Sequence, residues 1–426
     1  MRAFASYPPA MRLAFLTHEP FYPPSGGGSA EAVYLAQEFV RRGHEVHIFS
    51  PGFPEAEAVA QKFGVRLHRF TTWQMGRYAS FRNFKYLLFP AALQRMVRRA
   101  ARETPFDLLL SQHTISAVAA GRLRAQLGVP VVMNFLDYLT GFMETWPGWI
   151  APRPLVESLK RYELSLPERF HADGVLTVSD PLADLFVAAG CPRERILPIY
   201  YGYDAGLFRP ADAPLSAPIT TATSAIAAAA PVVVMHGSFD HHHLGAIAVG
   251  ALTEVQRQRP DVIFRFVGKQ TAGLVRCLAR LRETIPERNL QATGFVPYAE
   301  VAQHLRTATV GIVPYEESTG THCAFVAKAV EYLGVGLPAV STPLKNLRRY
   351  FADEPALRFA DFTGDSFARE ILGWLAEPPE RRRALGLAAS ARVRTALDWG
   401  AISRRAAGFV EAVREQHGAP ADRRRN

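Results

Sequence analysis

A lysine and a glutamate three residues apart, Lys328 and Glu331, are the side chains of this sequence whose types and spacing best suit chemistry. Residues at this spacing share one face of a helix. The pattern over 323–333 predicts such a helix, directly after a polar loop that contains glycine. A cation and a carboxylate on one face suit a nucleotide diphosphate and its ribose, so the helix predicts a site for a phosphorylated ligand.

The flanking segments predict where this helix lies. Short apolar runs at 311–314 and 338–341 predict buried strands before and after it, with a tight turn at Gly334 and Gly336. A loop that opens onto a helix at the carboxyl ends of parallel strands is where α/β proteins bind phosphorylated ligands. We therefore expect the rest of the chain to be organised around this pocket.

The start of the chain has a similar order of elements. An apolar run at 13–17 precedes a glycine-rich loop, a helical pattern over about 30–42 and a second apolar run at 45–50. This order is typical of the first βαβ unit of a doubly wound domain. The loop lacks G-x-G-x-x-G and no acid ends the second strand, so a dinucleotide site is disfavoured. Gly26 and Gly27 either form a tight turn or present backbone N–H groups to a ligand.

Asp137 follows another apolar run, 129–135, and we expect it at the carboxyl end of a strand. That place suits a ligand contact and the capping of a loop equally well. Tyr138, Trp146 and Trp149 make the following segment aromatic, which fits either sugar stacking or core packing.

Composition limits the class of protein. The chain has 426 residues, 48% hydrophobic and 21% charged, which predicts two or three globular domains. Lysine and arginine outnumber acids 49 to 39, and this balance favours acidic partners. Three widely spaced cysteines predict neither disulfides nor a zinc site and fit a reducing cytoplasm. No apolar run approaches the roughly 20 residues of a membrane span, and no signal peptide is recognisable.

The segment 62–102 carries ten basic residues and no acidic one, with aromatic residues between them. It fits a solvated helix face, or a contact with an anionic membrane surface or an acidic acceptor. Nucleic acid is disfavoured because no known motif accompanies the charge. The expected location is therefore cytoplasmic, with peripheral contact to the inner membrane face as an option.

A change of composition divides the chain. Residues 211–230 are mostly alanine, serine, threonine and proline, which predicts a linker. A second α/β pattern begins at 231. We therefore predict α/β architecture with an N-terminal Rossmann-like domain over 1–210, the linker 211–230, a second Rossmann-like domain over 231–400, and a C-terminal helix and basic tail over 401–426.

These segments together resemble the retaining GT-B glycosyltransferases called glycosyl transferase group 1 or family 4. The likeness covers nearly the whole chain and is carried by residues 11–50, by PIYYGYDAGLFRP at 198–210 and by KAVEYLGVGLPAVST at 328–342. It implies two doubly wound domains that face each other across a cleft. The N-terminal domain would bind a carbohydrate, lipid-linked or small-molecule acceptor, and the C-terminal domain would bind the sugar nucleotide.

The resemblance also implies a reaction. A sugar would pass from a nucleotide-diphosphate sugar to an acceptor hydroxyl with retention of configuration, without a metal or another cofactor. Glu331 matches the glutamate that holds the ribose, and Gly26 and Gly27 match the loop near the diphosphate. Lys328 would stabilise the leaving diphosphate and Asp137 would orient the sugar or acceptor. The expected donor-binding residues are completed by Gly237, Ser238, His243 and Phe325.

The chain departs from the family pattern at two places. Cys323 occupies the position of a second glutamate, for which Glu316 or Glu317 could substitute, and the basic pair after the first strand of the second domain is missing. His243 could take the place of the lysine of that pair; metal binding by the histidines around it is disfavoured. The alternative function is a non-catalytic GT-B protein that binds sugar nucleotides or forms complexes. A Rossmann oxidoreductase fits least.

Overall fold

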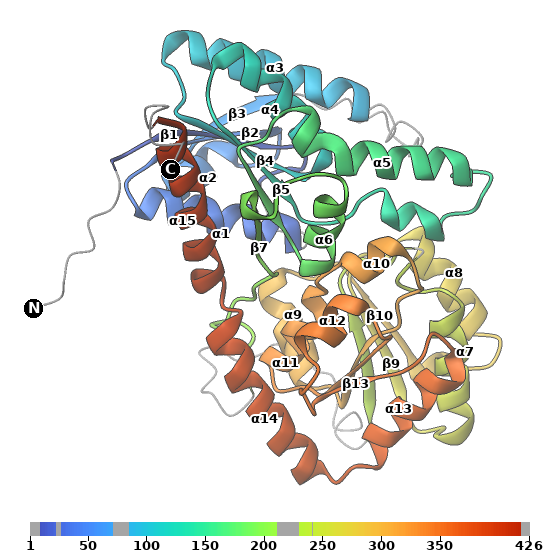
Figure 1. The fold of residues 1–426 in the computed structure, drawn as a ribbon. Helices are drawn as coiled ribbons and strands as arrows, with labels where there is room; N and C mark the ends of the chain where they lie inside the picture. Colours follow the sequence, from blue (N-terminus) through green and yellow to red (C-terminus); the bar gives the residue numbers. More distant parts are fainter. Residues whose placement is uncertain (1–8, 23–26, 71–84, 211–229, 241, 419–426) are drawn as a thin grey trace, which may run out of the picture. The chain divides into compact units, whose positions relative to one another are not determined.

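The computed structural model of the protein describes residues 9–22, 27–70, 85–210, 230–240 and 242–418. The chain forms two compact α/β units (Figure 1). The N-terminal unit comprises residues 1–140, 154–200 and 400–426, and the C-terminal unit comprises residues 141–153 and 201–399. The linker expected at 211–230 lies almost wholly outside the described residues, and the domain boundaries drawn from the sequence stay a prediction.

The N-terminal unit is built on a parallel sheet. In the described residues its strand order is β3-β2-β1-β4-β5-β6-β7. Residues 13–16 of β1 are fully buried, as expected for a parallel strand that is covered on both faces. The strands are β1 (Arg12–Thr17), β2 (Glu45–Pro51), β3 (Arg66–Phe70), β4 (Leu108–Gln112), β5 (Val131–Phe135), β6 (Gly174–Thr177) and β7 (Ile196–Pro198).

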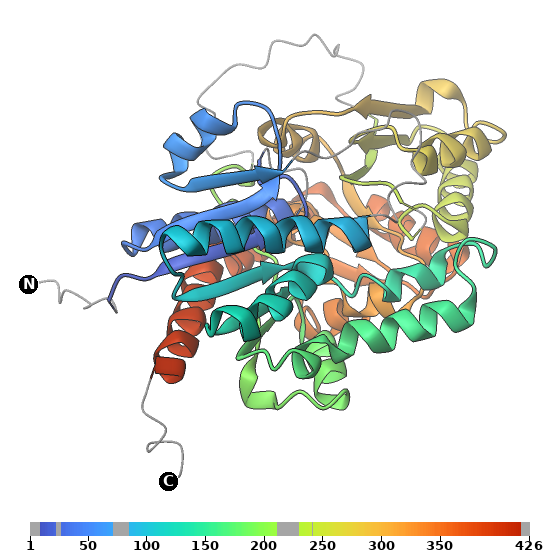
Figure 2. The same cartoon turned by 90° about the horizontal axis from the view of Figure 1, so that it is seen from above.

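The sheet order reverses between β1 and β4, because β2 and β3 extend to one side of β1 and β5 to β7 extend beyond β4. Helices α1 and α2 cover one face of the sheet, and α3 and α4 cover the other (Figures 1 and 2). The helices of this unit are α1 (Gly27–Arg41), α2 (Ala56–Phe63), α3 (Lys85–Glu103), α4 (His113–Leu127), α5 (Arg153–Arg169), α6 (Asp180–Ala188) and α15 (Trp399–Gly418).

The C-terminal unit repeats this plan. Its described strands are also parallel and follow the order β10-β9-β8-β11-β12-β13. They are β8 (Val232–His236), β9 (Ile263–Val267), β10 (Leu290–Gly294), β11 (Val310–Val313), β12 (Ala339–Ser341) and β13 (Leu357–Phe359). The order reverses between β8 and β11, so the carboxyl ends of these two strands mark the place where such sheets bind ligands.

The helices of the C-terminal unit are α7 (Ala246–Gln258), α8 (Ala272–Leu281), α9 (Tyr298–Arg306), α10 (Thr319–Cys323), α11 (Ala327–Gly334), α12 (Lys345–Tyr350), α13 (Gly364–Ala376) and α14 (Pro379–Ala396). The prediction of a single helix over 323–333 is wrong about where the helical segment begins and about its continuity. The chain forms the short helix α10 first and starts α11 only at Ala327. Ser318 and Thr321 cap α10 through reciprocal hydrogen bonds, which fixes its start four residues before the expected one.

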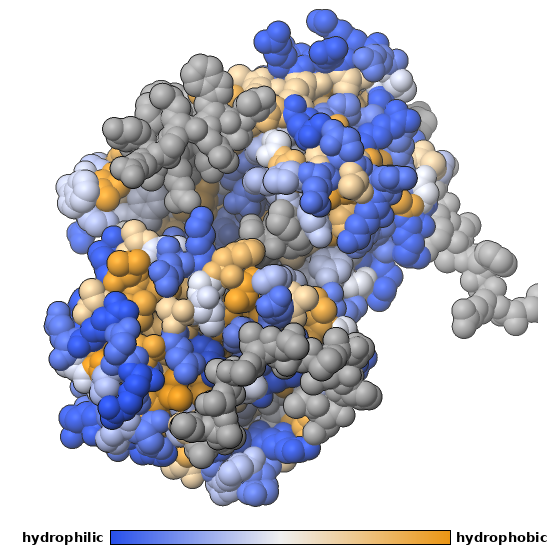
Figure 3. Space-filling model, turned by 180° about the vertical axis from the view of Figure 1, so that it is seen from behind, coloured by the Kyte–Doolittle hydropathy of each residue, from blue (hydrophilic) through white to orange (hydrophobic). Residues whose placement is uncertain are grey.

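The face of the molecule in Figure 3 shows hydrophobic side chains in small separate areas between hydrophilic ones. Within the described residues, no helix combines the length and the apolar character needed to cross a bilayer.

Candidate active site

Gly237 is the first residue after β8, at the point where the C-terminal sheet reverses its order. Its φ of 97° is a left-handed conformation that favours glycine. Its N–H donates at 2.9 Å to the carbonyl of Val267, the last residue of the neighbouring strand β9. Gly237 and the following Ser238 are exposed, so this turn is open to a ligand.

Lys328 reaches this turn from the first turn of α11. A Cβ at position 237 would lie 3.1 Å from Cε of Lys328 and 3.2 Å from its Nζ. The ammonium donates to the Tyr315 hydroxyl at 3.0 Å, and the residue is buried. The fold therefore places a cation beside the glycine turn, although the two residues are far apart in sequence.

His243 lies next to this cation, and its ring centroid is 4.6 Å from that of Tyr315. The backbone N–H of Asp240 donates to its Nδ1 at 2.9 Å, so the neutral ring carries its proton on Nε2. Burial holds the pKa of His243 well below its usual value, and His242 and Lys328 lower it further. His243 thus offers a neutral hydrogen-bond donor and cannot supply the positive charge expected of a lysine substitute.

Glu331 lies one turn further along α11 and is buried. The Tyr298 hydroxyl donates to its Oε1 at 2.7 Å, and the His236 ring nitrogen Nε2 forms a short hydrogen bond with its Oε2. Both carboxylate oxygens are therefore engaged within the protein. The sequence pattern indicated Glu331 but not Tyr298 or His236, which arrive from α9 and β8.

Cys323 is the last residue of α10, Phe325 lies between α10 and α11, and both are buried. The ring centroid of Phe325 is 5.1 Å from that of Tyr350 and 6.1 Å from that of Phe351. The Phe325 side chain thus belongs to the core, and a contact with a ligand would have to come from its backbone.

The Glu316 side chain contacts the start of α7. Its Oε1 accepts a 3.1 Å hydrogen bond from the N–H of Ile247, in the first turn of α7. A Cβ at Gly245 would lie 2.1 Å from the same oxygen, so this approach requires glycine. Glu316 therefore caps α7, where an anion is stabilised by the helix dipole.

A short segment from the middle of the chain extends the site of the C-terminal unit. Phe142 packs against His242 with centroids 4.5 Å apart. The Glu144 carboxylate accepts from the N–H and the hydroxyl of Thr319, both at 2.7 Å. The aromatic composition of residues 138–149 hinted at a role, but no signal in the sequence predicts this pairing.

The remaining expected residues belong to the N-terminal unit. Gly26 lies outside the described residues, and Gly27 is the first residue of α1. Asp137 is half-buried in the loop after β5.

Polar side chains that the sequence did not single out gather at the carboxyl edge of the N-terminal sheet. The rings of His18, after β1, and His113, after β4, meet edge to face at 5.1 Å. His113 has a φ of 66°, an unusual and costly conformation for a residue other than glycine. Glu31 of α1 accepts a 2.6 Å hydrogen bond from Asn134 of β5. Burial raises the pKa of Glu31 to about 8.

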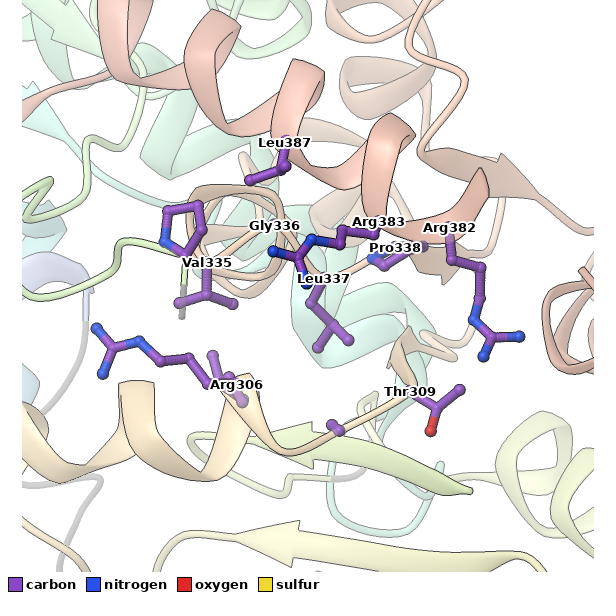
Figure 4. A pocket seen from close by; sticks show the side chains of 12 residues that line it. Arg306, Thr309, Val335, Gly336, Leu337, Pro338, Arg382, Arg383 and Leu387 are labelled. Carbon is purple, nitrogen blue, oxygen red and sulfur yellow. The ribbon is translucent and has the colours of Figure 1, made fainter. Parts of the chain in front are cut away.

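A cavity of about 240 Å³ lies at the opposite edge of the C-terminal sheet (Figure 4). It is lined by residues just before β11 and β12 and by α14, away from Gly237 and Lys328. Its Arg306 donates to the carbonyls of Leu207 and Arg209, and its Arg382 donates to carbonyls at the end of α13. These two arginines bind backbone carbonyls of the protein. We therefore do not assign the site for a phosphorylated ligand to this cavity.

In the described part of the chain, no group of three or more His, Cys, Asp or Glu side chains is arranged to hold a metal ion. The described groups at the β8–β11 edge include the Lys328 cation, the neutral imidazole of His243 and the exposed backbone of Gly237 and Ser238. This set suits a phosphate group.

Comparison with known proteins shows which family the chain belongs to. Residues 26–202 match the model of the glycosyl transferase 4-like domain, and residues 230–377 match that of the glycosyl transferases group 1. No curated protein sequence matches the chain.

Solved structures share the fold over almost the whole chain. HepE of Anabaena, solved with UDP and glucose, is 18% identical with a TM-score of 0.69 and covers 94% of this chain and 100% of its own. Sucrose-phosphate synthase of Thermosynechococcus elongatus is 16% identical with a TM-score of 0.75, over 95% and 100%. WaaG, a glycosyltransferase of lipopolysaccharide biosynthesis, is 14% identical with a TM-score of 0.63, over 93% and 99%. The chain belongs to the group 1 glycosyl transferases and has the GT-B fold.

Proposed function

We propose that the protein transfers a sugar from a nucleotide-diphosphate sugar to an acceptor hydroxyl, with retention of configuration and without a metal ion. The observation that carries the proposal is the position of the Lys328 ammonium beside the exposed turn at Gly237, with His243 close to this cation. HepE, which shares the fold, was solved with UDP-glucose, and this supports a sugar nucleotide as the donor.

The geometry suggests how the donor site works. Negative charge grows on the diphosphate as it leaves, and fixed donors that face this charge lower the barrier. The Lys328 ammonium, the Nε2–H of His243 and the first N–H groups of α11 are such donors. Backbone at Gly237 and Ser238, with backbone at Phe325, completes the proposed diphosphate site. Front-face attack by the acceptor, assisted by the departing phosphate, then retains the configuration.

Glu331 is the proposed ligand of the ribose hydroxyls. Tyr298 and His236 each bind one of its oxygens, so a ribose would either use the remaining lone pairs of the carboxylate or replace one of these contacts. In the N-terminal unit, Asp137 is proposed to orient the sugar or the acceptor, and Gly26 and Gly27 to approach the diphosphate. The acceptor class is a carbohydrate, a lipid-linked saccharide or a small molecule.

The experiment is an incubation of the full chain with a panel of radiolabelled UDP-, GDP- and ADP-sugars and a library of acceptor hydroxyls. The proposal expects transfer from at least one donor, with the anomeric configuration of the product the same as that of the donor. An inverted product would contradict the mechanism, and binding without any turnover would contradict the enzyme assignment.

A second candidate is a non-catalytic member of the family that binds sugar nucleotides or forms complexes. Cys323 stands where the family has a sugar-contacting glutamate, and Glu316, which could replace it, binds the N–H of Ile247 in the first turn of α7. Binding of a nucleotide sugar without turnover across the panel would favour this candidate.

We also propose that α3 contacts an anionic membrane surface on the cytoplasmic side. Arg95, Arg98, Arg99 and Arg102 are exposed on this helix, whereas Leu93 and Val97 are buried. Exposed basic side chains along one helix face attract anionic lipids. Co-sedimentation with vesicles that contain 30% phosphatidylserine should exceed that with pure phosphatidylcholine vesicles and should fall with salt. Equal binding to both kinds of vesicle would contradict an electrostatic contact between α3 and the membrane.

A further inference from the structure

The Glu31 carboxyl group connects α1 to β5 inside the N-terminal unit. Its Oε1 accepts the 2.6 Å hydrogen bond from Nδ2 of Asn134, and Glu31 and Asn134 are 2% and 0% exposed. β5 lies between β4 and β6, and Asn134 pairs in register with Gln112 of β4. The contact thus joins the helix after β1 to the strand beyond β4, across the point where the sheet order reverses.

One side-chain oxygen of each residue has no hydrogen-bond partner in the described part of the protein. Oε2 of Glu31 and Oδ1 of Asn134 are buried and unpaired. Leaving such atoms without partners within the protein is costly. The pair fits a neutral acid and an amide better than a carboxylate and an amide, since a buried charge without a cation would be more costly still.

Asp137 is three residues after Asn134, and its charge acts on Glu31. The other titratable groups at the neighbouring strand ends are His18, Glu19 and His113. Burial keeps His113 neutral at physiological pH by lowering its pKa. In the described residues no cation is recorded as acting on Glu31. Ionised Glu31 would be repelled by Asp137 and would bear the cost of burial, although the hydrogen bond from Asn134 favours the ionised form.

We propose that Glu31 is a positioning residue, which through Asn134 holds the carboxyl end of β5 and thereby fixes the Asp137 carboxylate where the proposed reaction uses it. This inference rests on the proposed function for the role of Asp137, but the positioning itself is a property of the N-terminal unit. The neutral form of Glu31 holds the loop in place, and the ionised form releases it.

The test compares Glu31→Ala and Glu31→Gln by hydrogen–deuterium exchange of the full chain, read from peptides that cover residues 131–140. Glutamine keeps the shape, the acceptor oxygen and the neutrality of the protonated acid. At pH 7, Glu31→Ala should increase the exchange of residues 135–138 by about tenfold, and Glu31→Gln should keep it close to wild type. Glu38→Gln is the matched control, since Glu38 is another buried carboxylate of α1, paired with Arg41 and Arg42; it should not alter exchange in 131–140.

The pH dependence of hydrogen–deuterium exchange distinguishes positioning by the neutral acid from a purely structural role of Glu31. This measurement does not need a folded Glu31→Ala variant. After correction for intrinsic exchange rates, wild type should lose protection in 135–138 between pH 7 and pH 9, and Glu31→Gln should not. If a donor is turned over, Glu31→Ala should lower kcat with little effect on the KM for that donor.

Two results would overturn the proposal: exchange in 135–138 that rises equally in Glu31→Gln and Glu31→Ala at pH 7, or a loss of protection above pH 7 that persists in Glu31→Gln. Failure of the proposed function has a different signature. In that case no sugar nucleotide is turned over by wild type, while the exchange results follow the expected pattern.

Discussion

The Tyr298 hydroxyl donates a 2.7 Å hydrogen bond to Oε1 of Glu331. With His236 on the other oxygen, the carboxylate is satisfied before any nucleotide arrives. We expect a ribose hydroxyl to compete with Tyr298 for this oxygen, because both donors would have to approach the same buried carboxylate.

Replacing Tyr298 with phenylalanine should therefore tighten nucleotide binding. The substitution removes the competing donor and keeps the ring, which packs against Phe208 at 5.1 Å. One hydrogen bond is worth about 1 kcal/mol, so calorimetry should show an affinity for UDP that is about three- to tenfold higher. Tyr332→Phe is the control, because the Tyr332 hydroxyl bonds to the carbonyls of Val234 and Ile312 and should affect stability only. A loss of affinity in Tyr298→Phe would mean that Tyr298 itself contacts the nucleotide.

Glu331→Ala should weaken nucleotide binding by at least about tenfold, or about 1.4 kcal/mol. It should also lower the free energy of unfolding by about 1–3 kcal/mol, because Tyr298 and His236 lose their buried acceptor. The affinity is measured by calorimetry, and the stability by urea unfolding. An affinity within about twofold of wild type, less than roughly 0.5 kcal/mol, would show that the ribose is bound elsewhere.

Glu316→Ala separates a helix cap from a sugar ligand. Loss of the contact with the N–H of Ile247 should reduce the free energy of unfolding by about 1 kcal/mol, with nucleotide-sugar affinity close to that of wild type. The measurement that distinguishes the two roles is the affinity of Glu316→Ala for UDP compared with its affinity for UDP-glucose. If the variant binds UDP normally but loses affinity for UDP-glucose, Glu316 contacts the sugar and the cap is secondary.

The stability of the protein should depend on pH through Glu31. The pKa of this group rises from 4.5 to about 8 on folding, chiefly through burial. Between these values the folded state keeps a proton that the unfolded state has lost, so stability falls as pH rises, by up to about 1.4 kcal/mol per pH unit. The contribution of Glu31 to the free energy of unfolding is fully present below pH 4.5 and is lost as the pH approaches 8.

Urea unfolding between pH 5 and 8 measures this slope. Glu31→Gln should remove most of it, and Glu38→Gln should retain it although it breaks the pairs with Arg41 and Arg42. A slope that is the same in wild type and Glu31→Gln would show that Glu31 titrates as an ordinary exposed acid.

The sequence predicted the strands and helices that carry the site because their signals are local. Apolar runs at 311–314 and 338–341 correspond to β11 and β12, and the pattern after residue 231 corresponds to β8, α7 and β9. The family resemblance is confirmed by the matches to both halves of the chain. The start of α11 was misjudged because the capping box at Ser318 begins a separate short helix, α10, which ends at Cys323 before the extended backbone of Ala324.

The contacts between distant elements could not be predicted in the same way. Lys328 meets Tyr315 and Gly237 only because β8 and β11 are neighbours in the sheet. Tyr298 reaches Glu331 from a helix 33 residues earlier, and no periodic pattern encodes this approach. The Glu31–Asn134 pair was missed because a lone glutamate on a helix usually faces solvent.

The most direct test of the central claim is the release of nucleoside diphosphate from a panel of UDP-, GDP- and ADP-sugars by wild type and by Lys328→Met. Methionine keeps the length of the side chain and removes the charge that faces the Gly237 turn. The account predicts release from at least one donor by wild type and a rate at least about a hundredfold lower in Lys328→Met, with a smaller change in nucleotide affinity. Release by Lys328→Met at the wild-type rate, or the absence of both binding and release for every donor, would contradict it.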